Sequence, residues 1–209
     1  MVAFVTFEGP EGSGKSTQIQ LLDRALRARG LGVVCTREPG GTAIGEQIRD
    51  VLHSHANTAM VPSAEVLLYS ADRAQHVAEV VAPALARGDI VISDRYAEST
   101  LAYQGYGRGL DMEALRRITA FAIGELWPDL VIYLDLDVEL GLRRKQREQA
   151  AGRGEWNRMD QEGLAFHRRV REGYLAMARA EPGRWLVVDG NQPVETIHRI
   201  ICERIAALL

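Results

Sequence analysis

The feature that most constrains this chain is a glycine-rich segment close to its amino terminus. Residues 3–8 form a short apolar run, and residues 9–17 read Gly-Pro-Glu-Gly-Ser-Gly-Lys-Ser-Thr. Apolar residues at helical spacing follow between residues 18 and 29. A strand, the pattern G-x-x-x-x-G-K-S and a helix in this order are typical of a phosphate-binding loop. We therefore expect a nucleoside triphosphate to bind at this segment.

The residue types of the loop explain why it suits phosphate. Its glycines let backbone N–H groups turn toward phosphate oxygens, and Lys15 can reach the β- and γ-phosphates. The Ser16 hydroxyl can ligate Mg²⁺ at the positive end of the following helix. The alternative, an ordinary glycine turn, is disfavoured because the flanking residues also fit the motif. The expected ATP-binding residues of the loop are Gly9, Pro10, Glu11, Gly12, Ser13, Gly14, Lys15, Ser16 and Thr17.

Composition favours one α/β domain and excludes several classes of protein. The 209 residues are 46% hydrophobic, which is enough to bury a core without a partner. A net charge of −3 argues against a general nucleic-acid binder. The sequence shows neither an apolar run of about 18 residues nor a signal peptide, so we expect a cytoplasmic protein with no membrane partner. Cys35 and Cys202 are expected to be buried free thiols.

Five apolar runs separated by helical patterns predict the architecture. The runs are residues 3–8, 33–36, 90–93, 130–134 and 185–189. Each is too apolar to alternate between two faces, which indicates a mostly parallel five-stranded sheet with helices on both faces. We expect one long helix from Pro62 to about Arg87 and another from Asp160 to about Ala180. The whole chain is predicted to be a single P-loop domain.

Charged residues stand where two of these runs end. Asp94 follows the third run, where a P-loop fold places a second carboxylate that organises Mg²⁺, and the adjacent Arg95 can bind a phosphate with two hydrogen bonds. A helix cap is the alternative role for Asp94. Arg37 follows the second run and is either a ligand-binding residue or part of a plain loop.

Two other features have an ordinary explanation as well as a functional one. Tyr69 and Arg73 lie four residues apart on a predicted helix and could grip a planar base, although spacing alone favours a structural pair. Residues 143–160 are rich in arginine, with glycines on both sides of Arg153. They could form a mobile lid over phosphates or a solvated helix face. A single arginine carries little weight, because the chain has 23 arginines and two lysines.

The charges around the loop narrow the reaction class. A GTPase would have an Asn-Lys-x-Asp motif, and neither lysine follows an asparagine. A nucleoside monophosphate attacks through an oxygen that is already anionic, so a kinase for such an acceptor needs cations rather than a base. Arg37, Arg73, Arg95 and the arginine-rich lid supply these cations.

Five segments together resemble the bacterial thymidylate kinase family over nearly the whole chain. They are residues 8–17, Thr-Arg-Glu-Pro-Gly-Gly-Thr at 36–42, Leu-Leu-Tyr-Ser-Ala-Asp-Arg-Ala at 67–74, Asp-Arg-Tyr-x-x-Ser-x-x-Ala-Tyr-Gln-Gly at 94–105 and Pro-Asp-Leu-x-Ile-Tyr-Leu-Asp at 128–135. The second and fourth are specific to the family. The resemblance implies a homodimeric nucleoside monophosphate kinase that converts dTMP to dTDP with Mg²⁺-ATP.

The same resemblance implies roles for individual residues. The implied dTMP-binding residues are Arg37, Tyr69, Arg73, Arg95, Ser99, Thr100 and Tyr103. Tyr69 would stack on thymine, Arg73 would bond its carbonyl edge, and Arg95 would hold the phosphate. Tyr103 would lie beside C2′ and disfavour a ribonucleotide. Gln192 is expected near the adenine of ATP, and Ser16 and Asp94 at the metal.

In the family that the chain resembles, the arginine that engages the transferred phosphate resides either in the phosphate-binding loop or in the lid. Residues 10–13 include no basic side chain, so the resemblance implies the lid version. Arg153 is the first choice and Arg147 the second. The implied catalytic residues are Lys15, Arg95, Arg153, Arg147 and Glu11. Residues 157–160 read Asn-Arg-Met-Asp where the family often has Asp-Arg-x-Glu, which leaves the carboxylate contacts of the lid open.

Three other functions are compatible with a P-loop. A different nucleoside monophosphate kinase would keep the loop, Asp94 and the lid but would have another base pocket. A small-metabolite kinase would need a carboxylate base at the acceptor. A nucleotide-binding regulator without turnover would leave the lid arginines idle.

Overall fold

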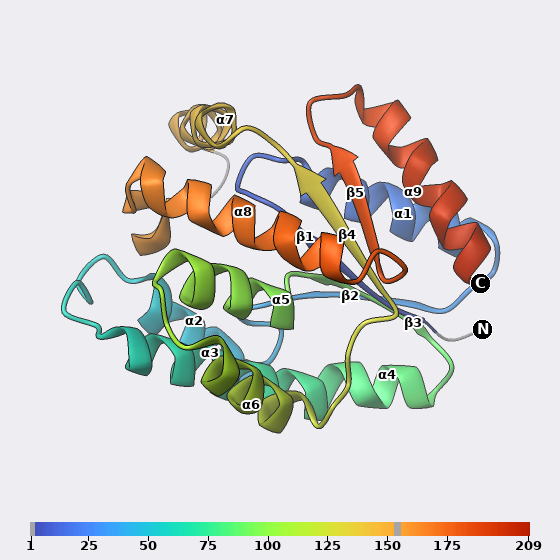
Figure 1. The fold of residues 1–209 in the computed structure, drawn as a ribbon. Helices are drawn as coiled ribbons and strands as arrows, with labels where there is room; N and C mark the ends of the chain where they lie inside the picture. The colour runs from blue at the N-terminus through green and yellow to red at the C-terminus, as the bar shows by residue number, and fades with distance from the viewer. Residues whose placement is uncertain (1–2, 153–155) are drawn as a thin grey trace.

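The computed structural model describes residues 3–152 and 156–209, which fold around a five-stranded parallel sheet (Figure 1). The strands are β1 (Ala3–Glu8), β2 (Val33–Arg37), β3 (Ile90–Asp94), β4 (Leu130–Asp135) and β5 (Trp185–Asp189). Their order across the sheet is β2-β3-β1-β4-β5. The predicted five-stranded α/β architecture is confirmed.

Parallel pairing brings the ends of the strands together at one edge of the sheet. Asp94 pairs with Phe7 of β1 on one side and with Arg37 of β2 on the other. On the far side of β1, Asp135 pairs with Asp189. The charged residues that end the strands therefore lie along a single edge, where parallel sheets bind ligands.

Helices cover both faces of this sheet (Figure 1). The α-helices are α1 (Lys15–Ala28), α2 (Ala43–His53), α3 (Pro62–His76), α4 (Ala82–Ala86), α5 (Ala97–Thr100), α6 (Met112–Ile123), α7 (Val138–Ala150), α8 (Leu164–Ala180) and α9 (Val194–Leu208). Two π-helical turns, η1 (Val77–Val81) and η2 (Leu101–Gly107), and a 3₁₀ turn, η3 (Arg158–Gln161), complete the set. Across the described ranges, no helix has the length and apolar character needed to span a membrane.

Successive side chains of each strand point to opposite faces of the sheet, so an apolar core lies on each face. Phe7 of β1 packs with apolar residues of α1 and α9, whereas Phe4 packs with residues of α4 and α6. On the second face, Tyr133 of β4 packs with α8, η2 and α3. These two apolar layers hold the strand ends in register beneath the site.

The predicted environment of Cys35 is wrong. β2 lies at the edge of the sheet and has one neighbouring strand, and its burial falls along its length: Val33 is buried, whereas Cys35 and Arg37, which follow it on the same face, are exposed. Cys202 is partly buried, and both thiols are free as predicted. Strand order, which composition does not reveal, decides this exposure.

Two helix boundaries also differ from prediction. The helix expected from Pro62 to about Arg87 consists of α3, the π-turn η1 and α4, and Pro83 stands at the start of α4, where it has no N–H to donate. Asp160 does not belong to α8. It lies in η3, where its side chain accepts from the Asn157 amide while the Asn157 side chain accepts from Met159. This capping box fixes the start of η3, and α8 begins only at Leu164.

Candidate active site

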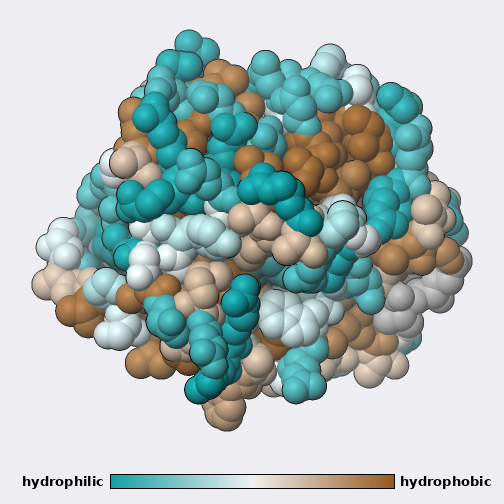
Figure 2. Space-filling view, viewed as in Figure 1, coloured by the Kyte–Doolittle hydropathy of each residue, from teal (hydrophilic) through white to brown (hydrophobic). Residues whose placement is uncertain are grey.

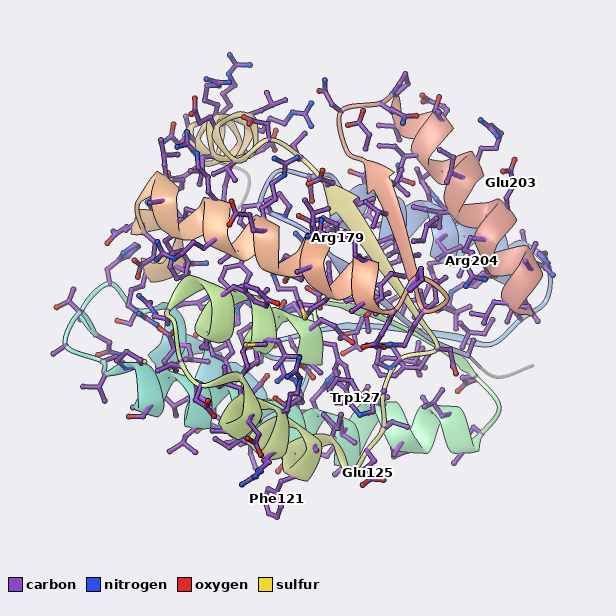
Figure 3. All side chains as sticks on the ribbon, viewed as in Figure 1. Phe121, Glu125, Trp127, Arg179, Glu203 and Arg204 are labelled. Atoms are coloured by element: carbon purple, nitrogen blue, oxygen red, sulfur yellow. The ribbon has the colours of Figure 1, made fainter. Side chains whose placement is uncertain are left out.

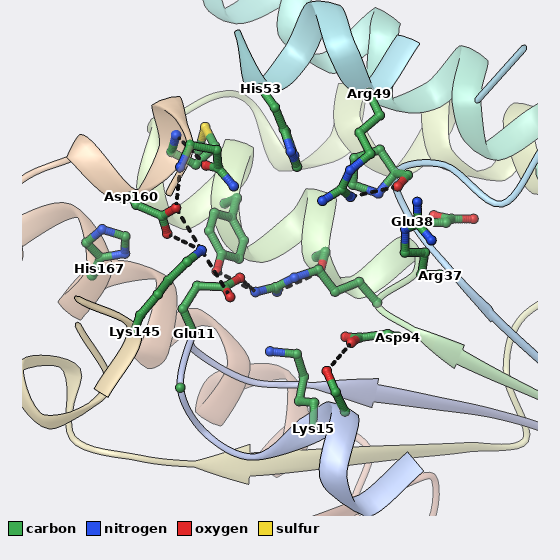
Figure 4. A pocket seen from close by; sticks show the side chains of 18 of the residues that line it. Glu11, Lys15, Arg37, Glu38, Arg49, His53, Asp94, Lys145, Asp160 and His167 are labelled. Atoms are coloured by element: carbon green, nitrogen blue, oxygen red, sulfur yellow. Dashed lines mark hydrogen bonds and ion pairs between the residues drawn. The ribbon is translucent and has the colours of Figure 1, made fainter. Parts of the chain in front are cut away.

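A cavity of about 1050 Å³ opens at the carboxyl edge of the sheet (Figure 4). Most of the residues predicted from the sequence line it: Glu11, Gly12, Gly14, Lys15, Ser16, Thr17, Arg37, Tyr69, Arg73, Asp94, Arg95, Ser99, Thr100, Tyr103 and Arg147. Its lining does not include Gly9, Pro10, Ser13 or Gln192. Arg153 lies outside the described residues. The structure thus brings together segments from most of the chain length.

The phosphate-binding loop owes its shape to glycines that have no room for a side chain. A Cβ at Gly9 would lie 2.6 Å from the Leu134 carbonyl oxygen, and one at Gly12 would lie 2.5 Å from that of Gly141. The loop therefore packs closely against β4 and α7. Lys15 begins α1, and its ammonium group donates to the carbonyl oxygens of Gly9 at 3.1 Å and Pro10 at 3.2 Å. This arrangement keeps the lysine within the loop.

The two residues predicted to hold a metal lie side by side. The Ser16 hydroxyl donates to the Asp94 carboxylate at 3.4 Å, although the residues are 78 positions apart in the chain. The pairing of β3 with β1 explains their proximity, since it brings Asp94 to the end of the strand that leads into the loop. A hydroxyl and a carboxylate are hard oxygen donors of the kind that Mg²⁺ takes from proteins.

Arg95 occupies the centre of a hydrogen-bonding network. Its backbone is left-handed (φ 70°), a conformation that costs a non-glycine residue about 1 kcal/mol or more and persists only where surroundings fix it. The Arg95 amide donates to the Phe7 carbonyl oxygen. Its guanidinium donates to Glu11 at 2.6 Å and to the Tyr103 hydroxyl at 3.1 Å, and it lies 5.1 Å from the centre of the Tyr103 ring. Arg95 therefore joins the phosphate-binding loop to the segment after β3.

Glu11 is held by a second cation that the sequence analysis did not single out. The ammonium group of Lys145 on α7 lies 3.2 Å from Glu11 and 2.7 Å from Asp160. Burial opposes ionisation of Glu11, but Lys15, Arg95 and Lys145 hold its pKa well below the usual value. Glu11 is consequently ionised, and it holds three cations close together in the lining of the cavity.

Arg73 is fixed by three buried partners. Its guanidinium donates to Glu38 at 2.7 Å, to the Thr100 hydroxyl at 2.8 Å and to the Tyr96 carbonyl oxygen at 2.9 Å. These bonds use three of its five N–H groups. Arg73 and Tyr69 both line the cavity, on the same wall. The spacing that predicted a shared face is thus confirmed, whereas the role of that face stays a prediction.

The remaining predicted arginines differ in position. Arg37 lines the cavity and donates to both carboxylate oxygens of Glu46. Arg147 also lines the cavity, from an exposed position on α7. Arg158, which belongs to the predicted lid, is buried away from the cavity, where it donates to Glu65 and to the Leu52 carbonyl oxygen. Arg158 therefore anchors η3 to α2 and α3.

Several residues of the cavity were not predicted. They are Gln20, Glu38, Pro39, Arg49, His53, Gln104, Arg144, Lys145, Glu148, Asn157, Met159, Asp160 and His167. One signal could have found Lys145, because the chain has two lysines and both line this cavity. Glu38 lies within the Thr-Arg-Glu-Pro-Gly-Gly-Thr segment, but the sequence does not reveal that it holds Arg73.

Comparison with known proteins identifies the family. The family model of thymidylate kinase matches residues 7–201. A thymidylate kinase of Roseiflexus sp. (strain RS-1) is 50% identical, covering 100% of this chain and 94% of the relative. One from Deinococcus radiodurans is 53% identical, covering 93% of this chain and 91% of the relative. The crystal structure of thymidylate kinase from Ehrlichia chaffeensis matches with a TM-score of 0.76 and 31% identity, covering 100% of this chain and 99% of that one. The chain therefore belongs to the thymidylate kinase family of nucleoside monophosphate kinases.

Proposed function

We propose that this chain transfers the γ-phosphoryl group of Mg²⁺-ATP to dTMP, giving ADP and dTDP for dTTP synthesis. The observation that carries the proposal is that one cavity contains both the phosphate-binding loop and the wall formed by Tyr69 and Arg73. Arg95 contacts Glu11 of the loop and Tyr103 of the opposite segment. A donor and an acceptor could therefore meet at this arginine.

ATP would bind with its phosphates over the loop and the amino terminus of α1, where backbone N–H groups favour negative charge. Lys15 would exchange the carbonyl oxygens of Gly9 and Pro10 for the β- and γ-phosphates. The adenine would extend toward the turn after β5, beside Gln192. Arg144 supports this location because it donates to the Gly190 carbonyl oxygen and to Asn191 in the same turn.

Ser16 and Asp94 would hold the Mg²⁺ ion that accompanies ATP. Their oxygen donors fit the ion, which keeps several waters and takes one or two protein ligands together with substrate phosphates. When bound, the ion would neutralise negative charge on the phosphates. The protein's own share is to keep the hydroxyl and the carboxylate adjacent through the register of β1 and β3.

The acceptor would need no general base, since the attacking phosphate oxygen is already anionic. Catalysis of phosphoryl transfer is mainly positioning and electrostatic stabilisation. Lys15, Arg95 and Lys145 all act on Glu11, so three cations are already gathered where two phosphates would meet. Tyr69 and Arg73 would hold thymine, and Ser99, Thr100 and Tyr103 would line the sugar and phosphate.

We also infer a single domain with a lid at about residues 143–160. Arg158 and its partner Glu65 would anchor the end of the lid, while Arg153, with Arg147 as the second choice, would engage the transferred phosphate. The glycines at 152 and 154 on either side of Arg153 would let this part move. Closure would exclude water from the reacting groups.

We further infer a homodimer that acts in the cytoplasm. The free thiols of Cys35 and Cys202 suit a reducing compartment. Phe121 on α6 is 91% exposed and points away from the molecule (Figure 3), and Leu67 on α3 is 59% exposed. In the same view, hydrophobic side chains lie among hydrophilic ones in the region of α3 and α6 (Figure 2). An apolar surface of this kind favours contact with a second copy.

The test is coupled ADP release with Mg²⁺-ATP and a panel of acceptors: dTMP, dUMP, dGMP, dCMP, AMP and UMP. We expect a strong preference for dTMP and a raised dTMP KM in Arg95→Ala. Preference for another monophosphate would contradict the base pocket but leave the P-loop chemistry intact. If no monophosphate were phosphorylated, the kinase function itself would be rejected.

A further inference from the structure

Glu8 is a fully buried carboxylate at the end of β1, directly before the phosphate-binding loop. One of its oxygens accepts the Tyr96 amide at 2.9 Å. The other accepts the hydroxyl groups of Ser99 and Tyr174, both at 2.7 Å. Glu8 therefore collects three donors from elements that are far apart in the sequence.

The same two hydroxyl groups also contact Arg95. One terminal nitrogen of the Arg95 guanidinium lies 3.3 Å from the Ser99 oxygen and 3.4 Å from the Tyr174 oxygen. A hydroxyl has one proton and two lone pairs. When its proton points to Glu8, its lone pairs are free to accept from the guanidinium. The buried carboxylate thus fixes which way both hydroxyl groups face.

Tyr174 is well suited to this role because it cannot move or ionise readily. Its side chain is fully buried on α8 and stacks on Tyr133, with 4.9 Å between ring centres. Burial and the adjacent Glu8 raise the pKa of Tyr174 well above its usual value, so the hydroxyl keeps its proton. Burial raises the pKa of Glu8 to about 7, although Arg95 opposes the shift, so the carboxylate is ionised at pH 8.

We propose that Tyr174 and Glu8 are positioning residues that orient the Arg95 guanidinium toward the phosphate of the acceptor nucleotide. Neither residue lines the main cavity, so both act through Arg95 rather than on the substrate. The inference rests on the proposed function, because it assumes that Arg95 holds the acceptor phosphate. It assigns a role in substrate binding to a tyrosine on α8, an element for which the sequence predicts a helix and no role at the site.

The test compares Tyr174→Phe with Tyr133→Phe at pH 8. Each variant loses one hydroxyl from a buried tyrosine, but the Tyr133 hydroxyl donates to Asp135 rather than to Glu8. We expect Tyr174→Phe to raise the dTMP KM about tenfold, with kcat and the ATP KM nearly unchanged, since one bond in a charged network is lost. Tyr133→Phe should leave all three constants close to wild type.

Inhibition by thymidine, which lacks the phosphate, distinguishes a loss of Arg95 positioning from a general distortion of the pocket. The inhibition constant of thymidine should be the same in Tyr174→Phe and in wild type, whereas a distorted pocket would weaken thymidine and dTMP alike. In an Arg95→Ala background the Tyr174→Phe effect on dTMP should vanish, because Tyr174 acts through that arginine. Glu8→Gln, which removes the charge but keeps the shape, should raise the dTMP KM in the same direction.

Two results would overturn the inference. One is an equal dTMP KM in Tyr174→Phe and Tyr133→Phe, and the other is a parallel loss of thymidine binding. Melting temperatures of all variants show whether the assay temperature keeps them folded. If the wild type fails to phosphorylate dTMP, the proposed function fails first, and that result is distinguishable because it does not depend on any variant.

Discussion

The ammonium group of Lys145 lies 3.2 Å from the carboxylate of Glu11, which connects helix α7 to the phosphate-binding loop. Lys145 also lies 2.7 Å from Asp160 in η3, so three segments meet at one cation. One of the carboxylate contacts that residues 157–160 left open is thus identified, because Asp160 contacts Lys145 of α7. The two lysines of the chain both face the place where phosphates would bind.

Lys145→Met should lower kcat by about 10²-fold, the order of effect seen when one charge-stabilising donor is removed. Lys145→Arg should recover part of the rate, since it restores the charge. Arg143→Met is the matched control, because Arg143 is an exposed cation on the same helix whose partner is Glu139. Steady-state kinetics with dTMP and ATP check the prediction. Equal rates for Lys145→Met and Arg143→Met would show that the Lys145 charge has no part in the reaction.

Arg153→Ala should lower the single-turnover rate by about 10³-fold or more, as expected for an arginine that stabilises the transferred phosphate. Arg147→Ala should have a smaller effect, since Arg147 lines the cavity from an exposed position on α7. Rapid-quench measurement with enzyme in excess over ATP isolates the chemical step. A larger loss in Arg147→Ala would reverse the assignment, and wild-type rates in both variants would argue for the non-catalytic regulator.

Burial of Asp72 should make the free energy of unfolding fall as pH rises. The Asp72 side chain is fully buried, one oxygen accepts the Gly40 amide, and the other makes no hydrogen bond. Burial and the neighbouring Glu38 raise its pKa from 3.8 to about 7. Between these values the folded chain holds a proton that the unfolded chain has released. This contribution to stability is complete below about pH 4 and is lost as pH rises through 7.

Asp72→Asn should therefore be less sensitive to pH than the wild type. Between pH 5 and pH 8 the wild type should lose about 2–3 kcal/mol of unfolding free energy that the variant keeps. Urea denaturation at both pH values measures the difference. Asp50→Asn, on the exposed side of α2, is the control. Parallel pH dependence in the wild type and Asp72→Asn would mean that Asp72 is already ionised at pH 5.

Much of the fold could be predicted because its signals are local. Each strand is a short apolar run, and the loop motif fixes where the first strand ends and α1 begins. The proximity of Ser16 and Asp94 also follows from the sequence, since Asp94 ends β3 and Ser16 lies at the start of α1, directly after the loop that follows the neighbouring strand β1. The loop motif and the parallel topology together are sufficient to predict that these two residues lie close together.

The rest depends on pairs of side chains that no local pattern encodes. Arg158 was grouped with the lid arginines, but its carboxylate partner, Glu65, lies 93 positions earlier in the chain. Tyr174 lies within a helix that the sequence predicts, but its hydroxyl contacts Glu8 across 166 positions, which no helical pattern reveals. Cys35 is exposed because β2 lies at the edge of the sheet. Strand order and long-range pairing arise only when the whole chain is assembled.

Phe121→Asp should convert the proposed dimer into a monomer. A large aromatic side chain that is 91% exposed gains little in an isolated chain, and aromatic residues at the centre of an interface often contribute about 2 kcal/mol or more to binding. A charge in its place should raise the dimer dissociation constant about 30-fold or more. Sedimentation velocity over a concentration series measures this constant.

Val194→Asp is the control for that experiment, because Val194 begins α9 and is 42% exposed, whereas Phe121 lies on α6. Only Phe121→Asp should weaken association, and both variants should keep the wild-type melting temperature of the monomer at low concentration. If the wild type sediments as a monomer at every concentration, the homodimer is rejected. If it is a dimer that Phe121→Asp leaves intact, the interface lies on a surface other than that of α6.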